Sequence, residues 1–242
     1  MIRTIYIIIL IYFLLGGIGF YLINRKKAPE LAKKSYTKYF VYFIIINILF
    51  FSIAVQPFVF HFLTVLIICA GSVELTRLFF NSNKKHIPFF LTSIITFIVI
   101  SLWFLLFSLL KKELTLYTFL VISIFDSFSQ ITGQLWGRKK ILPGISPNKT
   151  LGGLTGGIII ALISAFLLKN LFTGTITELL VFATGTVVFA FAGDVLASLY
   201  KRKYKVKDYS NLIPGHGGFL DRFDSLIAGG AWSAFYFQFI AT

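Results

Sequence analysis

The sequence predicts an all-α integral membrane protein with about eight transmembrane helices. Hydrophobic residues make up 57% of the 242 residues, charged residues make up only 13%, and the mean hydropathy is +0.86. A chain of this size and composition has too little polar surface to cover a soluble globule. Apolar runs long enough to cross about 30 Å of hydrocarbon also recur along the whole length. These observations together place the chain in a bilayer.

The eight predicted spans are the hydrophobic runs 4–24, 39–56, 58–76, 88–110, 114–136, 153–171, 177–200 and 223–241. We interpret the first run as a retained helix, because it is longer than a signal-peptide core and no small-residue cleavage pattern follows it. The run from 39 to 76 is nearly continuous. We divide it at Gln56-Pro57, because proline cannot continue the helical hydrogen-bond ladder and disfavours helix in the residue before it.

The basic residues indicate the orientation of these spans. With both the N-terminus and the C-terminus outside, 19 of the 23 lysines and arginines fall on the cytoplasmic side. The exceptions are Arg3, Lys111, Lys112 and Lys169. This separation follows the positive-inside rule. The net charge of +14 is therefore explained by topology and by contact with anionic membrane lipids, and nucleic acid is not an expected partner.

Acidic residues are scarce, so their positions are informative. Three of the nine, Glu74, Asp126 and Asp194, fall inside apolar runs beyond the first turn. An ionised group there costs several kcal/mol unless it is paired, metal-bound or hydrated, which makes each a candidate functional residue. For Glu74 the alternative is a salt bridge to Arg77, one helical turn away. The single cysteine, Cys69, excludes disulfides and cysteine zinc sites within one chain.

One helix face near residue 200 carries a group of polar side chains. The spacing i, i+4 and i+7 places Asp194, Ser198 and Lys201 on the same face, with Arg202 close by. An acid, a hydroxyl and two cations could together hold a metal-bound phosphate chain. The alternative for Lys201 and Arg202 is a basic collar that reaches the membrane interface.

A glycine-rich loop follows this helix. Gly215, Gly217 and Gly218 surround His216, so backbone amides can come close to a phosphate or a nucleotide. Asp221 then begins the last helix.

Two further groups of residues point to phosphate chemistry. Asp221 and Asp224, three residues apart at a helix start, suit a shared divalent cation. Arg222 between them could reach a phosphate oxygen or lie at the lipid headgroups. The segment Ser146-Pro147-Asn148-Lys149-Thr150 offers hydroxyls and a point charge to phosphates. Spaced glycines nearby instead favour close helix packing; they are Gly133 and Gly137, Gly152 and Gly156, and Gly153 and Gly157.

In these residues the chain resembles the phosphatidate cytidylyltransferase family. The C-terminal signature of that family reads here Ser198-x-x-Lys201-Arg202, then Lys207-Asp208, then Pro214-Gly215-His216-Gly217-Gly218-x-x-Asp221-Arg222-x-Asp224. A second block, Asp126, Gly133, Gly137, a basic run and Ser146-Pro147-x-Lys149-Thr150, agrees. The resemblance covers about residues 125–226. It departs from the family at Ala197, where Glu is common, and at Leu151-Gly152, where Trp and then Glu or Gln are common.

The resemblance implies that CTP and phosphatidate give CDP-diacylglycerol and pyrophosphate, with Mg²⁺ and a possible second cation, monovalent or divalent. It implies catalytic roles for Asp194, Lys201, Arg202, His216, Asp221, Arg222 and Asp224. Substrate-binding roles fall to Asp126, Ser146, Lys149, Thr150, Ser198, Lys207, Asp208, Gly215, Gly217 and Gly218. The metal ligands it implies are Asp194, Asp221 and Asp224.

The family also suggests a homodimer, and we expect a bacterial plasma or inner membrane location. Residues 1–110 are then N-terminal transmembrane helices, and residues 111–242 form a catalytic half whose site faces the cytoplasm. Two other functions stay open on the sequence. One is a related CTP-using enzyme that acts on another lipid phosphate or on a polyprenol. The other is a transporter, although the acids and glycines gather toward one membrane face and no paired interrupted helices appear.

Overall fold

The computed structural model describes residues 2–82, 85–213 and 217–240. Within these residues the chain forms eight α-helices, a 3-10 helix and a two-stranded antiparallel hairpin. The N-terminal helices are α1 (Ile2–Asn24), α2 (Pro29–Val55), α3 (Pro57–Asn81) and α4 (Ile87–Phe107). The remaining elements are α5 (Lys112–Trp136), β1 (Lys140–Leu142), β2 (Ser146–Thr150), α6 (Leu151–Leu167), η1 (Lys169–Leu171), α7 (Ile176–Lys203) and α8 (Leu220–Phe239).

Local sequence signals account for several helix ends. The predicted break at Gln56-Pro57 is confirmed, because α2 ends at Val55 and α3 begins at Pro57. Helix α7 begins with a capping box: Glu178 N donates to Thr175 Oγ1 at 3.3 Å, and Thr175 N donates to Glu178 Oε2 at 2.6 Å. These two hydrogen bonds satisfy backbone donors that a helix start would otherwise leave unpaired.

The outer faces of the helices are apolar, as a membrane protein requires. Leu14 on α1 and Phe58 on α3 are 67% and 81% exposed. Six of the described helices, α1 to α5 and α7, are long and apolar enough to cross a membrane. Helix α6 has only 17 residues, and α8 carries charged residues in its first turns. The all-α membrane fold is thus confirmed, with the hairpin β1–β2 as an element that the sequence did not predict.

Helix α5 lies at the centre of the bundle, where it contacts α1, α2, α6, α7 and α8. Its neighbours come close because glycines face it: a Cβ on Gly153 of α6 would lie 2.7 Å from the Ser129 carbonyl oxygen. Gly157 faces the Ser129 side chain in the same way. Close packing, the role expected for the spaced glycines, is therefore confirmed at these two positions. Gly193 lets α7 approach α8 in the same way, because a Cβ at this position would lie 2.6 Å from the Asp224 carbonyl oxygen.

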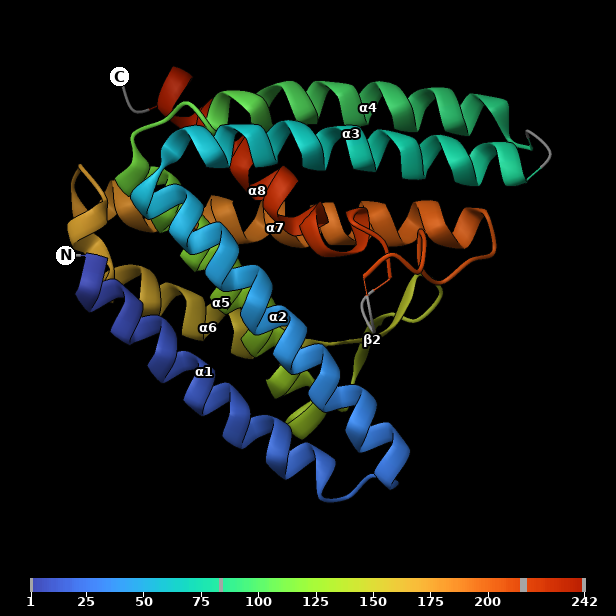
Figure 1. Cartoon of the computed structure of the whole chain (residues 1–242), viewed down its shortest axis with the longest axis horizontal. Coiled ribbons are helices and arrows are strands. Elements are labelled where there is room, and N and C mark those ends of the chain that lie inside the picture. Colours follow the sequence, from blue (N-terminus) through green and yellow to red (C-terminus); the bar gives the residue numbers. More distant parts are fainter. Residues whose placement is uncertain (1, 83–84, 214–216, 241–242) are drawn as a thin grey trace.

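The polar segments gather at one end of the bundle. Figure 1 shows both ends of the chain at the left, and the hairpin with the segment between α7 and α8 at the opposite end. Arg202 ties these two segments together, because its guanidinium donates to the Ile145 carbonyl at 3.0 Å and to the Val206 carbonyl at 2.9 Å. The fold thus brings together two polar stretches that are more than 50 residues apart.

Candidate active site

A cavity of about 850 Å³ opens among α1, α2, α5, α7, α8 and the hairpin. We call it the main cavity. The predicted site residues that line it are Asp126, Ser146, Lys149, Thr150, Asp194, Lys201, Lys207, Asp208, Asp221, Arg222 and Asp224. Residues from both halves of the resemblance therefore meet in one space, although most of them are far apart in the sequence.

Asp194 and Lys201 on the polar face of α7 line this cavity. Ser198 Oγ donates to Asp194 Oδ1 at 3.3 Å, one turn along the helix. The Lys149 ammonium from β2 forms an ion pair with Asp194 Oδ2 and lies 4.6 Å from the centre of the Phe191 ring. Asp194 thus joins the hairpin to α7, and its charge is partly balanced by Lys149.

Asp221 organises the segment that precedes α8. Its Oδ1 accepts a hydrogen bond from Lys201 Nζ at 2.5 Å, and its Oδ2 accepts from the backbone N–H of Tyr209 and of Gly218, each at 2.8 Å. The Asp221 and Lys201 side chains are only 2% and 10% exposed. Both oxygens of Asp221 are therefore occupied by protein donors.

Gly217 is required by the same arrangement. Its φ of +84° is one that residues with a side chain rarely adopt. A Cβ there would also lie 2.6 Å from Asp221 Oδ2. The glycine thus allows the backbone to pass directly against the carboxylate.

Asp126 and Asp224 face the main cavity from α5 and α8. Ser225 connects them: its backbone N–H donates to Asp224 Oδ1 at 2.8 Å, and its hydroxyl donates to Asp126 Oδ1 at 3.2 Å. Asp194 of α7 lines the same cavity. In the part of the chain that the structure describes, no group of three or more acidic, histidine or cysteine side chains has a metal-binding arrangement.

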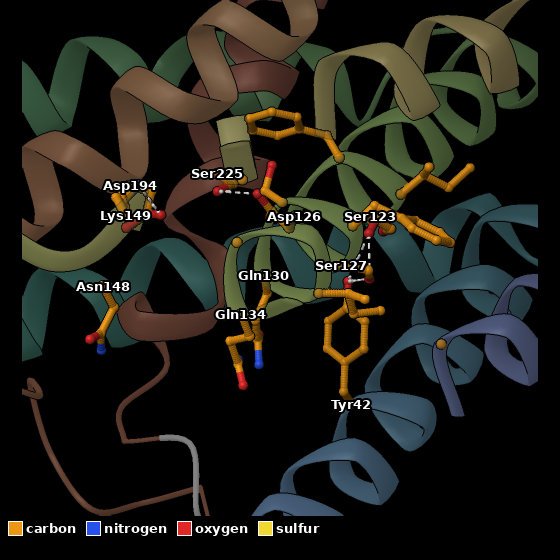
Figure 2. Close-up of a pocket in the computed structure, with 18 of the residues that line it drawn as sticks. Tyr42, Ser123, Asp126, Ser127, Gln130, Gln134, Asn148, Lys149, Asp194 and Ser225 are labelled. Carbon is orange, nitrogen blue, oxygen red and sulfur yellow. Dashed lines mark hydrogen bonds and ion pairs between the residues drawn. The ribbon is translucent and has the colours of Figure 1, made fainter. Parts of the chain in front are cut away.

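Figure 2 shows how these groups are placed across the cavity. The pair Lys149 and Asp194 lies on one side, and the Asp126–Ser225 contact lies in the middle. Tyr42 of α2 closes the other side, where it donates to the Ser123 carbonyl at 3.2 Å and accepts from Ser127 at 3.3 Å. Sequence reasoning missed Tyr42, because nothing local shows that α2 packs beside Asp126.

Some predicted residues support the site without facing the main cavity. Arg202 and Ser198 lie outside it, and Arg202 makes the link between hairpin and loop described above. Thr150 lines the cavity but also caps α6, because its hydroxyl accepts from Gly153 N at 3.1 Å. Gly218 packs against the carboxylate of Glu74. Gly215 and His216 lie outside the described residues.

Glu74 has a role that the sequence does not reveal. This buried side chain on α3 accepts hydrogen bonds from Phe219 N at 3.0 Å and Leu220 N at 2.8 Å, the start of α8. It also accepts from the Ser210 hydroxyl at 2.7 Å. The alternative role, a salt bridge to Arg77, is not among the ion pairs of the described residues. Glu74 therefore acts as the N-terminal cap of α8, supplied by another helix.

Two residues that depart from the family pattern, Ala197 and Gly152, lie close to other segments of the chain. Tyr209, in the loop, donates from its hydroxyl to the Ala197 carbonyl at 3.1 Å. Burial raises the pKa of the Tyr209 hydroxyl well above its usual range, so this donor stays protonated. A Cβ on Gly152 would lie 3.4 Å from Gly137 Cα, which is ordinary contact.

Comparison with known proteins identifies relatives of this chain. A model of the cytidylyltransferase family matches residues 111–240. The chain is 38% identical over 133 residues to a phosphatidate cytidylyltransferase of Haemophilus influenzae, covering 52% of this chain and 46% of that protein. It is 43% identical over 113 residues to one of Bacillus subtilis, covering 46% of this chain and 42% of that protein.

A longer match extends into the N-terminal half. The chain is 34% identical over 173 residues to a phosphatidate cytidylyltransferase of Rickettsia felis, covering 67% of this chain and 76% of that protein. The chain spans less than half the length of the Haemophilus and Bacillus relatives. The family model covers more than half of the chain, including the whole segment from α5 to α8. The chain therefore belongs to the cytidylyltransferase family.

Proposed function

We propose that this chain transfers the cytidylyl group of CTP to phosphatidate, giving CDP-diacylglycerol and pyrophosphate. One observation carries the proposal: the main cavity joins a cluster of carboxylates and cations to a wall of apolar side chains from α1 and α2. Asp194 and Lys149 belong to the charged cluster, and Phe13 and Ile46 belong to the apolar wall. A reaction between a water-soluble nucleotide and a lipid needs a cavity with both surfaces.

The negative charge on CTP and on phosphatidate determines what the site must supply for cytidylyl transfer. A phosphate oxygen of phosphatidate attacks the α-phosphorus of CTP in line, a new P–O bond forms, and the bond to the β-phosphate breaks as pyrophosphate leaves with the electron pair. Both reactants are anionic, so positioning and charge neutralisation dominate the catalysis. Lys149 and Lys201 line the cavity, and their ammonium groups would neutralise part of the negative charge on the phosphates. No protein nucleophile is needed.

The acidic residues present fit Mg²⁺. This ion prefers oxygen ligands and is commonly held by one or two carboxylates together with substrate phosphates. Asp224 and Asp126 each use only one oxygen in the hydrogen bonds of the described residues, and Asp194 lies near both. We propose Asp224 as a ligand, and Asp194 as a second ligand once the metal displaces the donors on its two oxygens, the Ser198 hydroxyl and the Lys149 ammonium. Bound Mg²⁺ would supply Lewis-acid neutralisation of the phosphates.

The metal role of Asp221 stays a prediction, because both of its oxygens are engaged by Lys201, Tyr209 and Gly218. A second cation, monovalent or divalent, also stays part of the proposal. These roles can be separated by titrating each aspartate variant with Mg²⁺ and with K⁺.

The finer topology belongs to the proposal as well. We infer eight spans with both termini outside, in a bacterial plasma membrane, so that the hairpin and the loop before α8 face the cytoplasm, where CTP is made. The basic residues favour this orientation. Cysteine labelling at Lys140 and at Thr175 from each side of the membrane tests it. We also propose a homodimer, which light scattering in detergent tests.

The main experiment combines purified protein in detergent with CTP, Mg²⁺ and dioleoyl-phosphatidate, and follows both CDP-lipid and pyrophosphate by mass spectrometry. Undecaprenol and undecaprenyl phosphate serve as alternative acceptors, because the departures at Ala197 and Gly152 leave another lipid as the second candidate. CDP-diacylglycerol that Asp221→Asn and Asp224→Asn no longer form would support the proposal. Product only with a polyprenol acceptor would exclude it.

A further inference from the structure

Three cations meet in the wall of the main cavity. Lys38 of α2 lines it together with Lys207 and Arg222. The same three side chains line a smaller adjoining cavity of about 230 Å³ with Asp208. Among the described residues, none of the three forms an ion pair or a side-chain hydrogen bond. We call them the cation cluster.

The cation cluster is electrostatically unbalanced. Lys38 is repelled by both Lys207 and Arg222, and Asp208 offsets part of this charge. Three cations beside one carboxylate leave a net positive charge, and the resulting positive potential attracts anions. A lone exposed lysine would only extend into water, but here three chain segments, α2, the loop and α8, bring their charges to one place. The ligand chemistry that this arrangement fits is a phosphate group.

The position of Lys38 along α2 places the cluster near the reacting groups. Lys38 precedes Tyr42 by four residues, about 6 Å along the helix. The Tyr42 hydroxyl accepts from Ser127 at 3.3 Å, and Ser127 directly follows Asp126. Lys38 and Asp126 line the same cavity, and Lys38 lies one turn of α2 before Tyr42.

The apolar wall of the main cavity continues from the cluster along α1 and α2. It includes Tyr12, Phe13 and Phe20 of α1 and Tyr39 and Ile46 of α2. Both helices are long and apolar enough to cross a membrane and expose large apolar side chains on their outer faces, so we place the wall at membrane depth. Lys149 lies on the far side of Asp126 from Tyr42 (Figure 2). Lys38 lies on α2 next to the wall residue Tyr39, so the cluster adjoins the surface that acyl chains would contact.

We propose that Lys38, Lys207 and Arg222 bind the phosphate of the lipid acceptor while its acyl chains lie against the wall of α1 and α2. This inference rests on the proposed function and assigns the acceptor to one side of the cavity. Lys38 is the new element, since it lies outside the residues 111–240 that the family model matches. It makes the N-terminal half part of the acceptor site.

The test separates the two sources of phosphate, the lipid and CTP. Lys38→Met should raise the KM for dioleoyl-phosphatidate in mixed micelles about tenfold, the loss expected for one charge-assisted contact. The KM for CTP should change less than twofold. Lys38→Arg should restore most of the affinity for phosphatidate. Lys34→Met, one turn earlier on α2 and lining neither cavity, is the matched control and should behave as wild type.

Three results would overturn the inference: a raised KM for CTP alone, no change in either KM, or the same effect from Lys34→Met. Direct titration of the wild type and each folded variant with dihexanoyl-phosphatidate, dihexanoyl-phosphatidylcholine and inorganic phosphate, without CTP, adds a readout independent of turnover. We expect binding selective for phosphatidate, weakened in Lys38→Met. If the wild type binds phosphatidate in this way but forms no CDP-lipid, the proposed function fails while the acceptor site stands.

Discussion

Glu74 Oε2 on α3 accepts a hydrogen bond from the backbone N–H of Leu220, the first residue of α8, at 2.8 Å. The partners are 146 residues apart in the chain. Because the first N–H groups of a helix have no intrahelical acceptor, a buried carboxylate at this point both satisfies them and complements the helix dipole. The N-terminal helices therefore fix the start of the helix that carries Asp221 and Asp224.

Glu74→Ala should loosen the start of α8. It removes three hydrogen bonds to a buried carboxylate, and we expect a local loss of about 2–4 kcal/mol. Amide hydrogen exchange at residues 218–221 should accelerate, and kcat should fall more than KM, because the aspartates lose their alignment. Glu30→Ala, an exposed acid on α2, is the control. Unchanged exchange in Glu74→Ala would show that the cap has no such role.

The Lys201–Asp221 pair should behave as a coupled unit. Both side chains are buried, so removing one partner leaves an uncompensated charge that costs about 3–5 kcal/mol. We expect Lys201→Met and Asp221→Asn each to lower the melting temperature in detergent. The double variant should lose less than the sum of the two. Strict additivity would mean that the two groups act independently.

Gly217 and Gly144 form a matched pair of glycines. Gly217→Ala places a methyl group 2.6 Å from Asp221 Oδ2 at a φ of +84°, whereas a Cβ on Gly144 meets nothing within 4 Å. Gly217→Ala should therefore reduce cytidylyl transfer at least tenfold through displacement of Asp221. Gly144→Ala should retain activity within twofold of wild type. Equal rates for the two variants would show that a Cβ at position 217 does not displace Asp221.

Asp224→Asn tests the proposed metal ligand. Replacing a carboxylate oxygen by an amide weakens binding of a hard cation, so the Mg²⁺ concentration for half-maximal rate should rise about tenfold or more. Chelation of divalent cations should abolish wild-type turnover. If Asp224→Asn lowers kcat without moving the Mg²⁺ dependence, Asp224 serves a different role.

Local signals predicted the features that depend on residues close in sequence. Proline at position 57 determined the break between α2 and α3, and helical spacing placed Ser198 within hydrogen-bond reach of Asp194. The same reasoning put Asp221 and Asp224 together on one face of α8. In the structure both side chains line the main cavity, and Asp221 also accepts hydrogen bonds from the backbone N–H groups of Tyr209 and Gly218 in the preceding loop.

Contacts between distant segments could not be predicted. Arg77 was the only nearby partner for Glu74, whereas the actual donors come from α8 and the preceding loop. In the sequence, Lys38 is one of several basic residues that the positive-inside rule explains. Its position beside Arg222 depends on how α2 packs against α5, which the sequence does not show. The hairpin β1–β2 was also missed, since its residues carry no alternating apolar pattern.

The most direct test of the central claim follows the phosphorus atoms of CTP. Purified protein in detergent is incubated with dioleoyl-phosphatidate and Mg²⁺, and with CTP labelled in parallel reactions at the α- or the γ-phosphate. Cytidylyl transfer predicts that the α-label enters the lipid and the γ-label is recovered in pyrophosphate. Transfer of the γ-label to the lipid, with release of CDP, would show a lipid kinase and contradict the account.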